Sequence, residues 1–159
     1  MRRTTVFLHR PAKEELTFRR VLLSDPETMS YNDPWGGAIG FPPSRWDSWY
    51  AAWADPGTEG RFYRYVLDAE TGLFVGETAY HTDPDEGIVL ADVLIHSRFR
   101  NRGFGTRGLR LLCAAAKENG ISELYDDIAA GNPGLNLFLR NGFEETGRSE
   151  TSVRVRKRL

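Results

Sequence analysis

The sequence is poor in the residues that form covalent or metal cross-links. It has one cysteine, Cys113, and three histidines, His9, His81 and His96. A single cysteine excludes an internal disulfide and a cysteine-based zinc cluster, and the histidines lack the spacing of a metal site. We therefore expect no metal, and the absence of disulfides fits the reducing cytoplasm.

Long apolar runs are absent as well. No apolar stretch could span a bilayer, and the basic segment 1–9 lacks the apolar core of a signal peptide. The 159 residues suit one domain with one core, and 40% hydrophobic with 27% charged residues is typical of a globular protein. We expect a single domain over residues 1–159, with no membrane partner.

The charges separate along the chain although the net charge is only -1. Residues 25–59 hold six acids and one base, whereas residues 98–110 hold five arginines and no acid. One surface should therefore attract cations and another anions. The basic end of the chain is interpreted as a half-buried strand, because Val153 and Val155 alternate with arginines. With this net charge, we expect no nucleic-acid partner.

Hydrophobic periodicity and turn residues predict the order of elements. Strands are expected at 4–9, 62–67, 74–82, 88–95, 124–128, 143–146 and 152–156. Helices are expected at 11–23, from a capping box at 44–47 onward, through 109–116 up to Asn119-Gly120, and at 135–140, with loop at 31–43. This order predicts an α/β (mixed α+β) fold: a mostly antiparallel mixed sheet of about six or seven strands flanked by about four helices.

Aromatic residues recur at helical spacing in the second of these helices. They are Trp46, Trp49, Tyr50 and Trp53. We interpret this stripe as core packing, with a ligand-stacking platform as the alternative. Cys113, on the apolar face of the next helix, is interpreted as a small core residue.

The clearest functional signal lies between Val93 and Thr106. A strand leads through a loop containing Gly103 and Gly105 into a helix, which brings free backbone N–H groups and the positive end of a helix dipole together. Glycines allow the backbone to approach phosphate oxygens, and the nearby arginines add positive charge. The pattern predicts a site for a polyanionic cofactor; the alternative for the arginines is a solvated helix face.

Residues 103–108 also match the dinucleotide motif G-x-G-x-x-G, with Asp126 and Asp127 near the distance of a ribose-binding acid. Three features oppose a nicotinamide-dependent domain. Seven residues separate Ile95 from Gly103, the preceding strands form a meander, and too little chain follows for the rest of a Rossmann domain. A P-loop is excluded because no Gly-Lys-Ser/Thr follows.

Two motifs together resemble the GNAT acyltransferase superfamily. Arg100-x-x-Gly103-x-Gly105 is similar to its pyrophosphate-loop signature, (Arg/Gln)-x-x-Gly-x-(Gly/Ala), and residues 132–143 are similar to its Asn–short helix–Gly-Phe motif. Their order and spacing match the family, and the resemblance covers residues 60–147. It implies an acetyl-CoA-dependent N-acetyltransferase, with a non-catalytic acyl-CoA-binding sensor domain as the alternative.

The resemblance also implies where the cosubstrate lies. In this family the strand before the loop splays from its neighbour, here 88–95 from 124–128, and the pantetheine arm lies in the gap. The backbone of Ile95 and Ser97 should pair with pantetheine, and the N–H groups of residues 100–106 should bind the pyrophosphate. The implied cofactor-binding residues are Ile95, Ser97, Arg100, Asn101, Arg102, Gly103, Phe104, Gly105, Thr106, Asn132, Phe138 and Arg140.

The family chemistry is direct attack of an amine on the thioester within a ternary complex. An amine with a pKa of about 10 needs a base, and the developing oxyanion needs an N–H donor, which the resemblance assigns to Ile95. Three acids on the central strands are candidate bases, in the order Glu77, Asp126, Asp92. His96 is expected to be structural.

Two positions depart from the family pattern. Phe138 stands where many members have the tyrosine that protonates the leaving thiolate, and Ser97 stands where proline is usual. A ring without a hydroxyl has no proton to give, so Tyr31, Tyr80 or solvent would have to replace it.

The acid-rich segment falls where the family builds its acceptor wall. We expect Tyr31, Asn32, Asp33 and Trp35 to line it and a cationic acceptor, either a small metabolite with a primary amine or a peptide N-terminus. A plain solvated surface is the alternative. A homodimer is expected by analogy alone.

Overall fold

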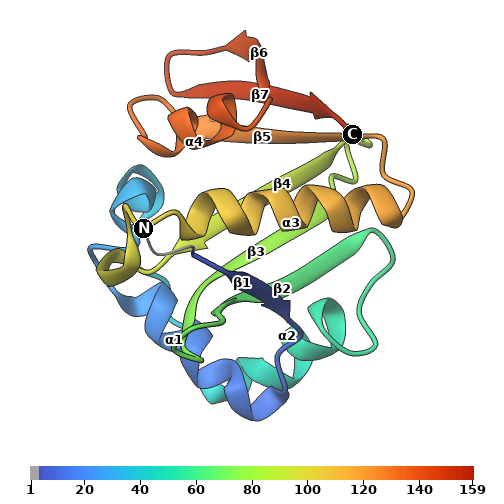
Figure 1. Ribbon diagram of the computed structural model, residues 1–159. Helices are drawn as coiled ribbons and strands as arrows, with labels where there is room; N and C mark the ends of the chain where they lie inside the picture. Colours follow the sequence, from blue (N-terminus) through green and yellow to red (C-terminus); the bar gives the residue numbers. More distant parts are fainter. Residues whose placement is uncertain (1–3) are drawn as a thin grey trace.

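A seven-stranded mixed sheet forms the centre of the molecule, in the order β1-β2-β3-β4-β5-β7-β6 (Figure 1). The computed structural model describes residues 4–159, so the basic residues 1–3 lie outside it. All neighbouring strands run antiparallel except β4 and β5. The strands are β1 (Val6–His9), β2 (Arg61–Asp68), β3 (Phe74–Thr82), β4 (Val89–Ile95), β5 (Glu123–Ala129), β6 (Glu144–Arg148) and β7 (Ser152–Arg158). The expected fold class is confirmed.

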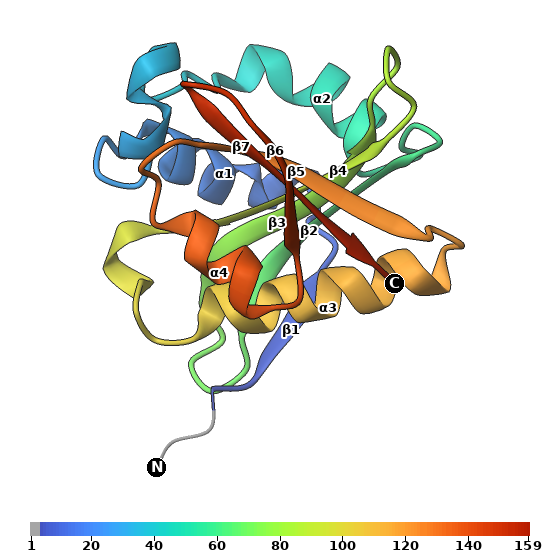
Figure 2. The same cartoon turned by 90° about the horizontal axis from the view of Figure 1, so that it is seen from above.

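Helices cover both faces of this sheet (Figure 2). One face carries α1 (Leu16–Ser24) and α2 (Trp46–Trp53), and the other carries α3 (Phe104–Glu118) and α4 (Gly134–Arg140). Four short 3-10 turns join the elements: η1 (Lys13–Glu15), η2 (Ser30–Trp35), η3 (Pro43–Arg45) and η4 (Ser97–Phe99). Side chains on one face of the sheet therefore pack against α1 and α2, and those on the other face pack against α3 and α4.

Local structure before the second strand differs from three expectations. The helix expected from Pro11 begins as η1, because the Glu15 carboxylate accepts from the Ala12 N–H and tightens the first turn. The expected loop at 31–43 contains η2. The expected capping box at 44–47 is wrong: η3 places Arg45 at the helix start, and no side chain caps α2.

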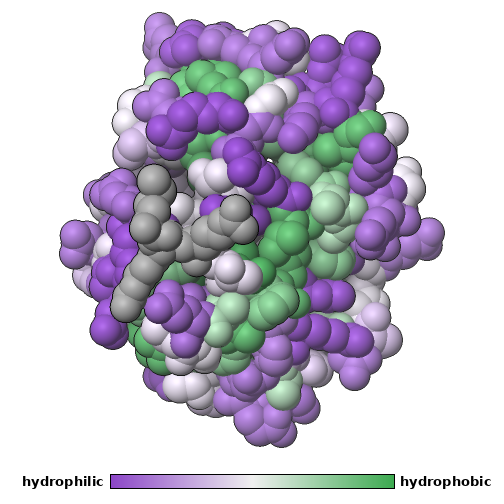
Figure 3. All heavy atoms as spheres, in the orientation of Figure 1, coloured by the Kyte–Doolittle hydropathy of each residue, from purple (hydrophilic) through white to green (hydrophobic). Residues whose placement is uncertain are grey.

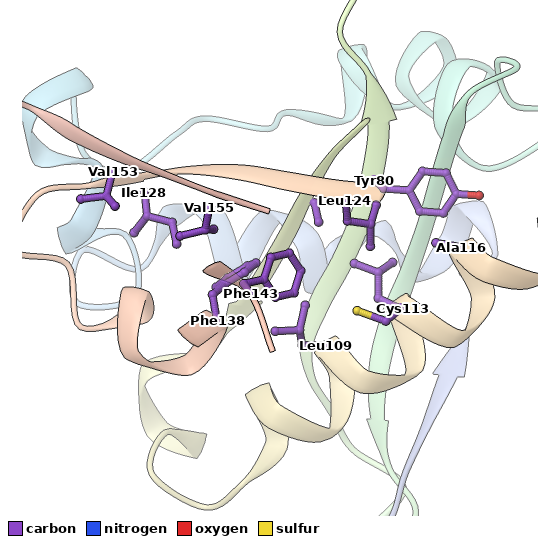
Figure 4. Packing of buried hydrophobic residues seen from close by; sticks show 12 residues of the cluster. Tyr80, Leu109, Cys113, Ala116, Leu124, Ile128, Phe138, Phe143, Val153 and Val155 are labelled. Atoms are coloured by element: carbon purple, nitrogen blue, oxygen red, sulfur yellow. The ribbon is translucent and has the colours of Figure 1, made fainter. Parts of the chain in front are cut away.

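The largest core lies between the sheet and the helices α3 and α4 (Figure 4). Leu109, Leu112 and Cys113 of α3 pack there, which confirms the predicted apolar face of this helix and the interpretation of the cysteine. Val153 and Val155 of β7 are fully buried in the same core, which confirms the half-buried final strand. Burying each such side chain contributes about 1.5–3 kcal/mol.

The aromatic stripe of α2 packs against the core on the opposite face, with its side chains partly buried. The rings of Trp49 and Tyr63 meet edge to face at 4.7 Å, and those of Trp49 and Trp53 stack at 6.4 Å. Two polar ends are satisfied by backbone carbonyls: Trp46 Nε1 donates to Phe41 at 3.0 Å, and the Tyr50 hydroxyl donates to Pro11 at 2.9 Å. The stripe thus fixes α2 on β2.

The sheet ends in a polar edge. Every residue of β6 is exposed, and the region over β6 and β7 is mostly hydrophilic in the space-filling view (Figure 3). Charged side chains on an edge strand oppose pairing with another chain. None of the helices within residues 4–159 is long and apolar enough to cross a membrane.

Candidate active site

The strands β4 and β5 separate almost as soon as they meet. They share a single residue pair, Leu90 with Tyr125, whereas β4 stays paired with β3 up to Ile95. Beyond that pair the C-terminal half of β4 has no partner on its β5 side. The splay implied by the sequence resemblance is present.

The alternation of hydrogen bonds shows which backbone groups face this gap. In the β3–β4 register, the Asp83 N–H donates to the Ile88 carbonyl at 2.8 Å and the His96 N–H donates to the Val75 carbonyl at 2.9 Å. Antiparallel pairing alternates, so the even-numbered residues of β4 bond to β3 and the odd-numbered ones face β5.

Ile95 therefore presents its N–H to the gap, as expected for an oxyanion donor. Val93 lies two residues earlier and presents its own N–H to the same gap, a candidate that sequence reasoning missed. The Ile95 carbonyl already accepts one hydrogen bond within the protein, from Arg100 Nε at 3.2 Å.

The loop after β4 gathers unbonded N–H groups at the start of α3. Asn101 and Gly103 adopt left-handed conformations, with φ of 61° and 88°. The first helical hydrogen bond runs from Arg107 to Gly103, so the N–H groups of residues 101–106 donate to no described protein atom. A glycine suits this turn because a left-handed φ is costly for other residues. Such a cluster fits an anion of the size of a diphosphate.

Two residues expected to bind the cosubstrate instead hold this loop in place. The Ser97 N–H donates to Thr28 Oγ1 at 2.9 Å, and the Ser97 carbonyl accepts from the Arg100 N–H. This contradicts the expected pairing of Ser97 with pantetheine. Arg100 donates through its guanidinium to the Thr28 carbonyl at 2.7 Å and to Ile95, so both its N–H and its side chain are used within the protein.

Asp25 is the centre of this loop anchor. Its Oδ2 accepts from the Thr28 hydroxyl, the Thr28 N–H and the Ser97 hydroxyl, and lies 3.6 Å from His96 Nε2. These hydrogen bonds, led by the Thr28 hydroxyl, lower the pKa of Asp25 to about 2. His96 is structural, as expected, and also accepts from the Arg98 N–H at 3.3 Å. The segment after α1 is thereby fixed to the cosubstrate loop.

We expect Asp25→Asn to weaken the binding of coenzyme A about tenfold, because an amide replaces a charged acceptor and loosens the anchor. Isothermal titration calorimetry measures the effect, with the exposed neighbour Glu27→Gln as control. Because the folded pKa of Asp25 lies below the unfolded value of about 3.8, its stabilisation is present above pH 4 and is lost as the pH falls toward 2. Equal affinities in the two variants would contradict the anchor.

The second motif supports the gap from the α4 side. Asn132 Oδ1 accepts from the Gly134 N–H at 2.8 Å and so fixes the start of α4, while Nδ2 has no partner within residues 4–159. Phe138 is 4% exposed and packs edge to face on Phe143 at 4.9 Å (Figure 4). Phe138 is thus held in the core under α4, and its contact with the cosubstrate stays a prediction. Arg140 is exposed.

The arginines between 98 and 110 have different surroundings. Arg98 and Arg102 lie over the ring of Phe99, at 5.0 and 6.0 Å, beside the N–H cluster. Arg110 donates to Asn141 at 3.1 Å, and Arg107 is exposed. Arg98 and Arg102 therefore supply the positive charge nearest the loop.

The first-ranked base, Glu77, is held in a buried ion pair. Its carboxylate lies 3.3 Å from Arg19 Nε and accepts a short hydrogen bond from the Tyr63 hydroxyl. Arg19 in turn lies over Trp49 at 4.4 Å and Phe41 at 4.7 Å. The sequence did not point to Arg19, because nothing in its local pattern indicates a partner 58 residues away.

The other two candidate bases form no ion pair within residues 4–159. Asp92 retains accessible surface, but the protein packed around it raises its pKa by removing water, an effect that His81 opposes and Glu77 reinforces. Asp126 has a pKa raised well above the usual value, first by burial and then by the charge of Asp92. Two interacting carboxylates with raised pKa values are typical of a catalytic centre.

Tyr31 of η2 is 37% exposed, and its hydroxyl lies within the electrostatic influence of these acids. Burial of its hydroxyl, followed by the charges of Asp92, Glu77 and Asp126, raises its pKa to about 12. Tyr80 lies elsewhere: its hydroxyl accepts from Asn119 Nδ2 at 2.9 Å, at the C-terminal end of α3. The alternative role of Tyr80 as thiolate acid is therefore wrong.

The rest of the acid-rich segment does not converge on one wall. Asn32 Nδ2 donates to the Gly37 carbonyl at 2.8 Å and closes the turn, while Asp33 and Trp35 are exposed. Asp47 pairs with Lys13 at 2.9 Å and Asp55 pairs with Arg10 at 3.2 Å. Of the four expected acceptor residues, Tyr31 is the one whose pKa is shifted by the charges of the central acids, and the acceptor wall stays a prediction.

A splayed pair of central strands beside a diphosphate-sized N–H cluster defines an acyl-CoA-dependent acyltransferase. The sequence profile of the acetyltransferase (GNAT) domain matches residues 6–144. The chain therefore belongs to the GNAT family of N-acetyltransferases, whose members use an acyl-CoA. The dinucleotide interpretation is ruled out, because the strands before the loop are antiparallel.

Solved structures share the whole fold. A domain from Methanocaldococcus jannaschii has a TM-score of 0.79 at 16% identity, covering 99% of this chain and 100% of its own. Spermidine N-acetyltransferase from Vibrio cholerae, in complex with CoA and spermine, has a TM-score of 0.77 at 18% sequence identity. The match covers 96% of this chain and 95% of that enzyme. Ribosomal-protein-alanine N-acetyltransferase from Brucella melitensis has a TM-score of 0.75 at 20% sequence identity. The match covers 96% of this chain and 99% of that enzyme. No curated protein matches the sequence.

Proposed function

We propose that the protein transfers an acetyl group from acetyl-CoA to a primary amine by direct attack within a ternary complex. The observation that carries the proposal is the opening between β4 and β5, which lies between the unbonded N–H groups of residues 101–106 and the unpaired acids Asp92 and Asp126. Acetyl-CoA bound in this opening would present its thioester to those acids.

The N–H cluster fits the pyrophosphate of the cosubstrate. The odd-numbered residues of β4 offer N–H groups along the pantetheine arm, and Ile95 or Val93 would stabilise the oxyanion. The Asn132 amide still has its Nδ2 free to donate to the arm. Arg98 and Arg102 add positive charge at the phosphate end.

The base is Asp92 or Asp126 in this proposal, since Arg19 and Tyr63 already hold the carboxylate of Glu77. An acid with a raised pKa is better matched to an amine proton than an ordinary carboxylate. Tyr31 is expected to line the acceptor side.

The acceptor is proposed to be a cationic amine, on a small metabolite or at a peptide N-terminus. The support is the pair Asp92 and Asp126, which has no ion-pair partner within residues 4–159 and carries a net negative charge when it shares one proton, so that it attracts ammonium groups. Two structural neighbours are named for amine substrates, spermidine and the alanine of a ribosomal protein. The acids of 25–59 contribute less than the sequence suggested, because several are paired elsewhere.

We expect Thr106→Asp to abolish coenzyme A binding while the protein stays folded. The new carboxylate would occupy the unbonded N–H groups and repel the diphosphate, weakening binding about 100-fold, whereas an acid in the first turn stabilises α3. Thr106→Asn is the matched neutral control. The measurements are calorimetric titration with coenzyme A and the Tm of each variant.

Catalysis itself is tested by the release of free thiol from acetyl-CoA with a panel of primary amines. Thiol release that depends on an amine, and that Thr106→Asp removes, supports the enzyme. Tight binding of acetyl-CoA without release across the panel would instead support a sensor domain. Stabilisation by NAD but not by coenzyme A would overturn the proposal.

A further inference from the structure

The two unpaired carboxylates lie on opposite faces of the sheet. Asp92 is paired with Ala79, whose side chain packs with Tyr63 and Trp49 on the α1/α2 face. Asp126 lies two residues from both Leu124 and Ile128 and therefore shares their face of the sheet, and their side chains belong to the core under α3 and α4. The charge of Asp92 nevertheless raises the pKa of Asp126, so the two groups are electrostatically coupled across the gap between the strands.

Both acids stand where the strands begin to separate. The only shared pair is Leu90 with Tyr125, so Asp92 follows it by two residues on β4 and Asp126 by one residue on β5. A thioester in the gap would have the amine approaching from the side of Asp92 and Tyr31. Its sulfur would lie toward the other face.

The α3/α4 face is also the face of Phe138. This residue occupies the family position of a hydroxyl donor and shares its core with Leu124 and Ile128, the neighbours of Asp126 on β5. Asp126 is therefore the proton-bearing group on the side where the hydroxyl is missing.

We propose that the two acids divide the proton transfers, Asp92 taking the proton of the attacking amine and Asp126 giving its proton to the departing thiolate. This inference rests on the proposed acetyl transfer. The ammonium first releases one proton to solvent; the free amine then forms the C–N bond, its nitrogen passes a proton to Asp92, and the C–S bond breaks as sulfur takes the proton of Asp126. Transfer of the proton from Asp92 to Asp126 restores the starting state.

Before the reaction, the two carboxyl groups of Asp92 and Asp126 must together carry one proton. Removal of water by the surrounding protein is the main cause that raises the pKa of both acids, and the Asp92 charge raises that of Asp126 further, which supports placing the shared proton on Asp126. The other groups facing the pair act in both directions: Glu77 and Asp127 favour protonation, whereas His81 and the Asp127 N–H oppose it. Tyr31 faces the pair from η2.

The isosteric variants Asp126→Asn and Asp92→Asn test the division. Each is expected to lower kcat about 100–1000-fold, the usual effect of one acid or base. In the pH profile of kcat/KM, Asp126→Asn should remove the basic limb and Asp92→Asn the acidic limb. Hydroxylamine as acceptor should partly restore Asp92→Asn but not Asp126→Asn, because its low basicity makes the nitrogen that forms the C–N bond acidic enough to lose its proton to water.

Asp127→Asn is the matched control. This acid lies next to Asp126 but is exposed and pairs with Arg154 at 2.8 Å, so its loss should leave kcat close to that of the parent protein. Carboxyl NMR titration of the free protein gives a readout without substrate: Asp126 should titrate at the higher pH, and Asp92→Asn should lower its midpoint.

The outcomes separate the two proposals. If the parent protein releases no thiol with any amine, the proposed function fails. If it is active but Asp126→Asn keeps the basic limb, or if Asp126 titrates as an ordinary carboxylate, the division of proton transfers fails while the function stands. Loss of coenzyme A binding in a variant would mark a folding defect, and the NMR titration of the parent then decides.

Discussion

The variant Gly76→Ala should be about 3 kcal/mol less stable than the parent protein, and it should lose most of its affinity for coenzyme A. Gly76 of β3 lies opposite Ile95, and an added Cβ would collide with the Leu94 carbonyl oxygen and lie 3.0 Å from the Ile95 Cα. Backbone atoms have no rotamer that relieves the clash, so β4 would have to move just before the cosubstrate loop. Urea unfolding and calorimetric titration measure the two losses.

Gly147→Ala is the control for this change. It makes the same substitution in a strand, β6, but a Cβ there meets no atom within 4 Å. Its stability should stay close to that of the parent protein. If the two variants were equally stable, the close approach of β3 and β4 at Ile95 would be disproved.

On the face of the sheet that carries α1 and α2, Arg19→Met should be the most destabilising change. It leaves the Glu77 carboxylate buried without its cation, and breaking a buried pair in this way costs about 3–5 kcal/mol. Methionine keeps apolar contact with Trp49 and Phe41, so the loss reports mainly on the unpaired charge. Thermal and urea unfolding provide the free energies.

A double variant isolates that charge. Arg19→Met with Glu77→Gln removes both members of the pair and should recover most of the loss, because no buried ion remains. Arg154→Gln serves as the exposed comparison, since Arg154 pairs with Glu86 and Asp127 at the surface and should matter little. A double variant as unstable as Arg19→Met would show that the aromatic contacts, and not the pair, hold α1 on the sheet.

The local pattern of the sequence predicted most elements closely. Strand β3 matches its expected range, and β2, β4 and β5 differ by one residue at each end or less, because the alternation of apolar residues over a half-buried strand is written locally. Strands β1, β6 and β7 differ by up to two residues at an end, and the errors in the type of element fall around 11–47, where prolines and short 3-10 turns set the chain path. There the decisive bonds, such as Glu15 to Ala12, compete with simple helical periodicity.

The residues of the candidate site were likewise predicted well where their signal is local in the sequence and poorly where it is not. The cosubstrate loop was predictable because its signal is contiguous: a strand, two glycines and a helix start within residues 95–106. The family resemblance assigned Ser97 and Arg100 to the ligand, and nothing in the sequence indicated their bonds to Thr28, about 70 residues earlier. The burial of Phe138 likewise depends on Phe143 and on the core under α3.

By itself, the sequence determined the element order, the anion-binding loop and the family, because each depends on residues close together in the chain. Only the tertiary structure decided which acids stay free. Glu77 is neutralised by Arg19, and Asp25 is bound to Ser97, whereas Asp92 and Asp126 lie unpaired where β4 and β5 separate. Such pairings depend on strand register and helix packing across distant segments, and the charge of a carboxylate in a protein is set by the groups that this packing places around it.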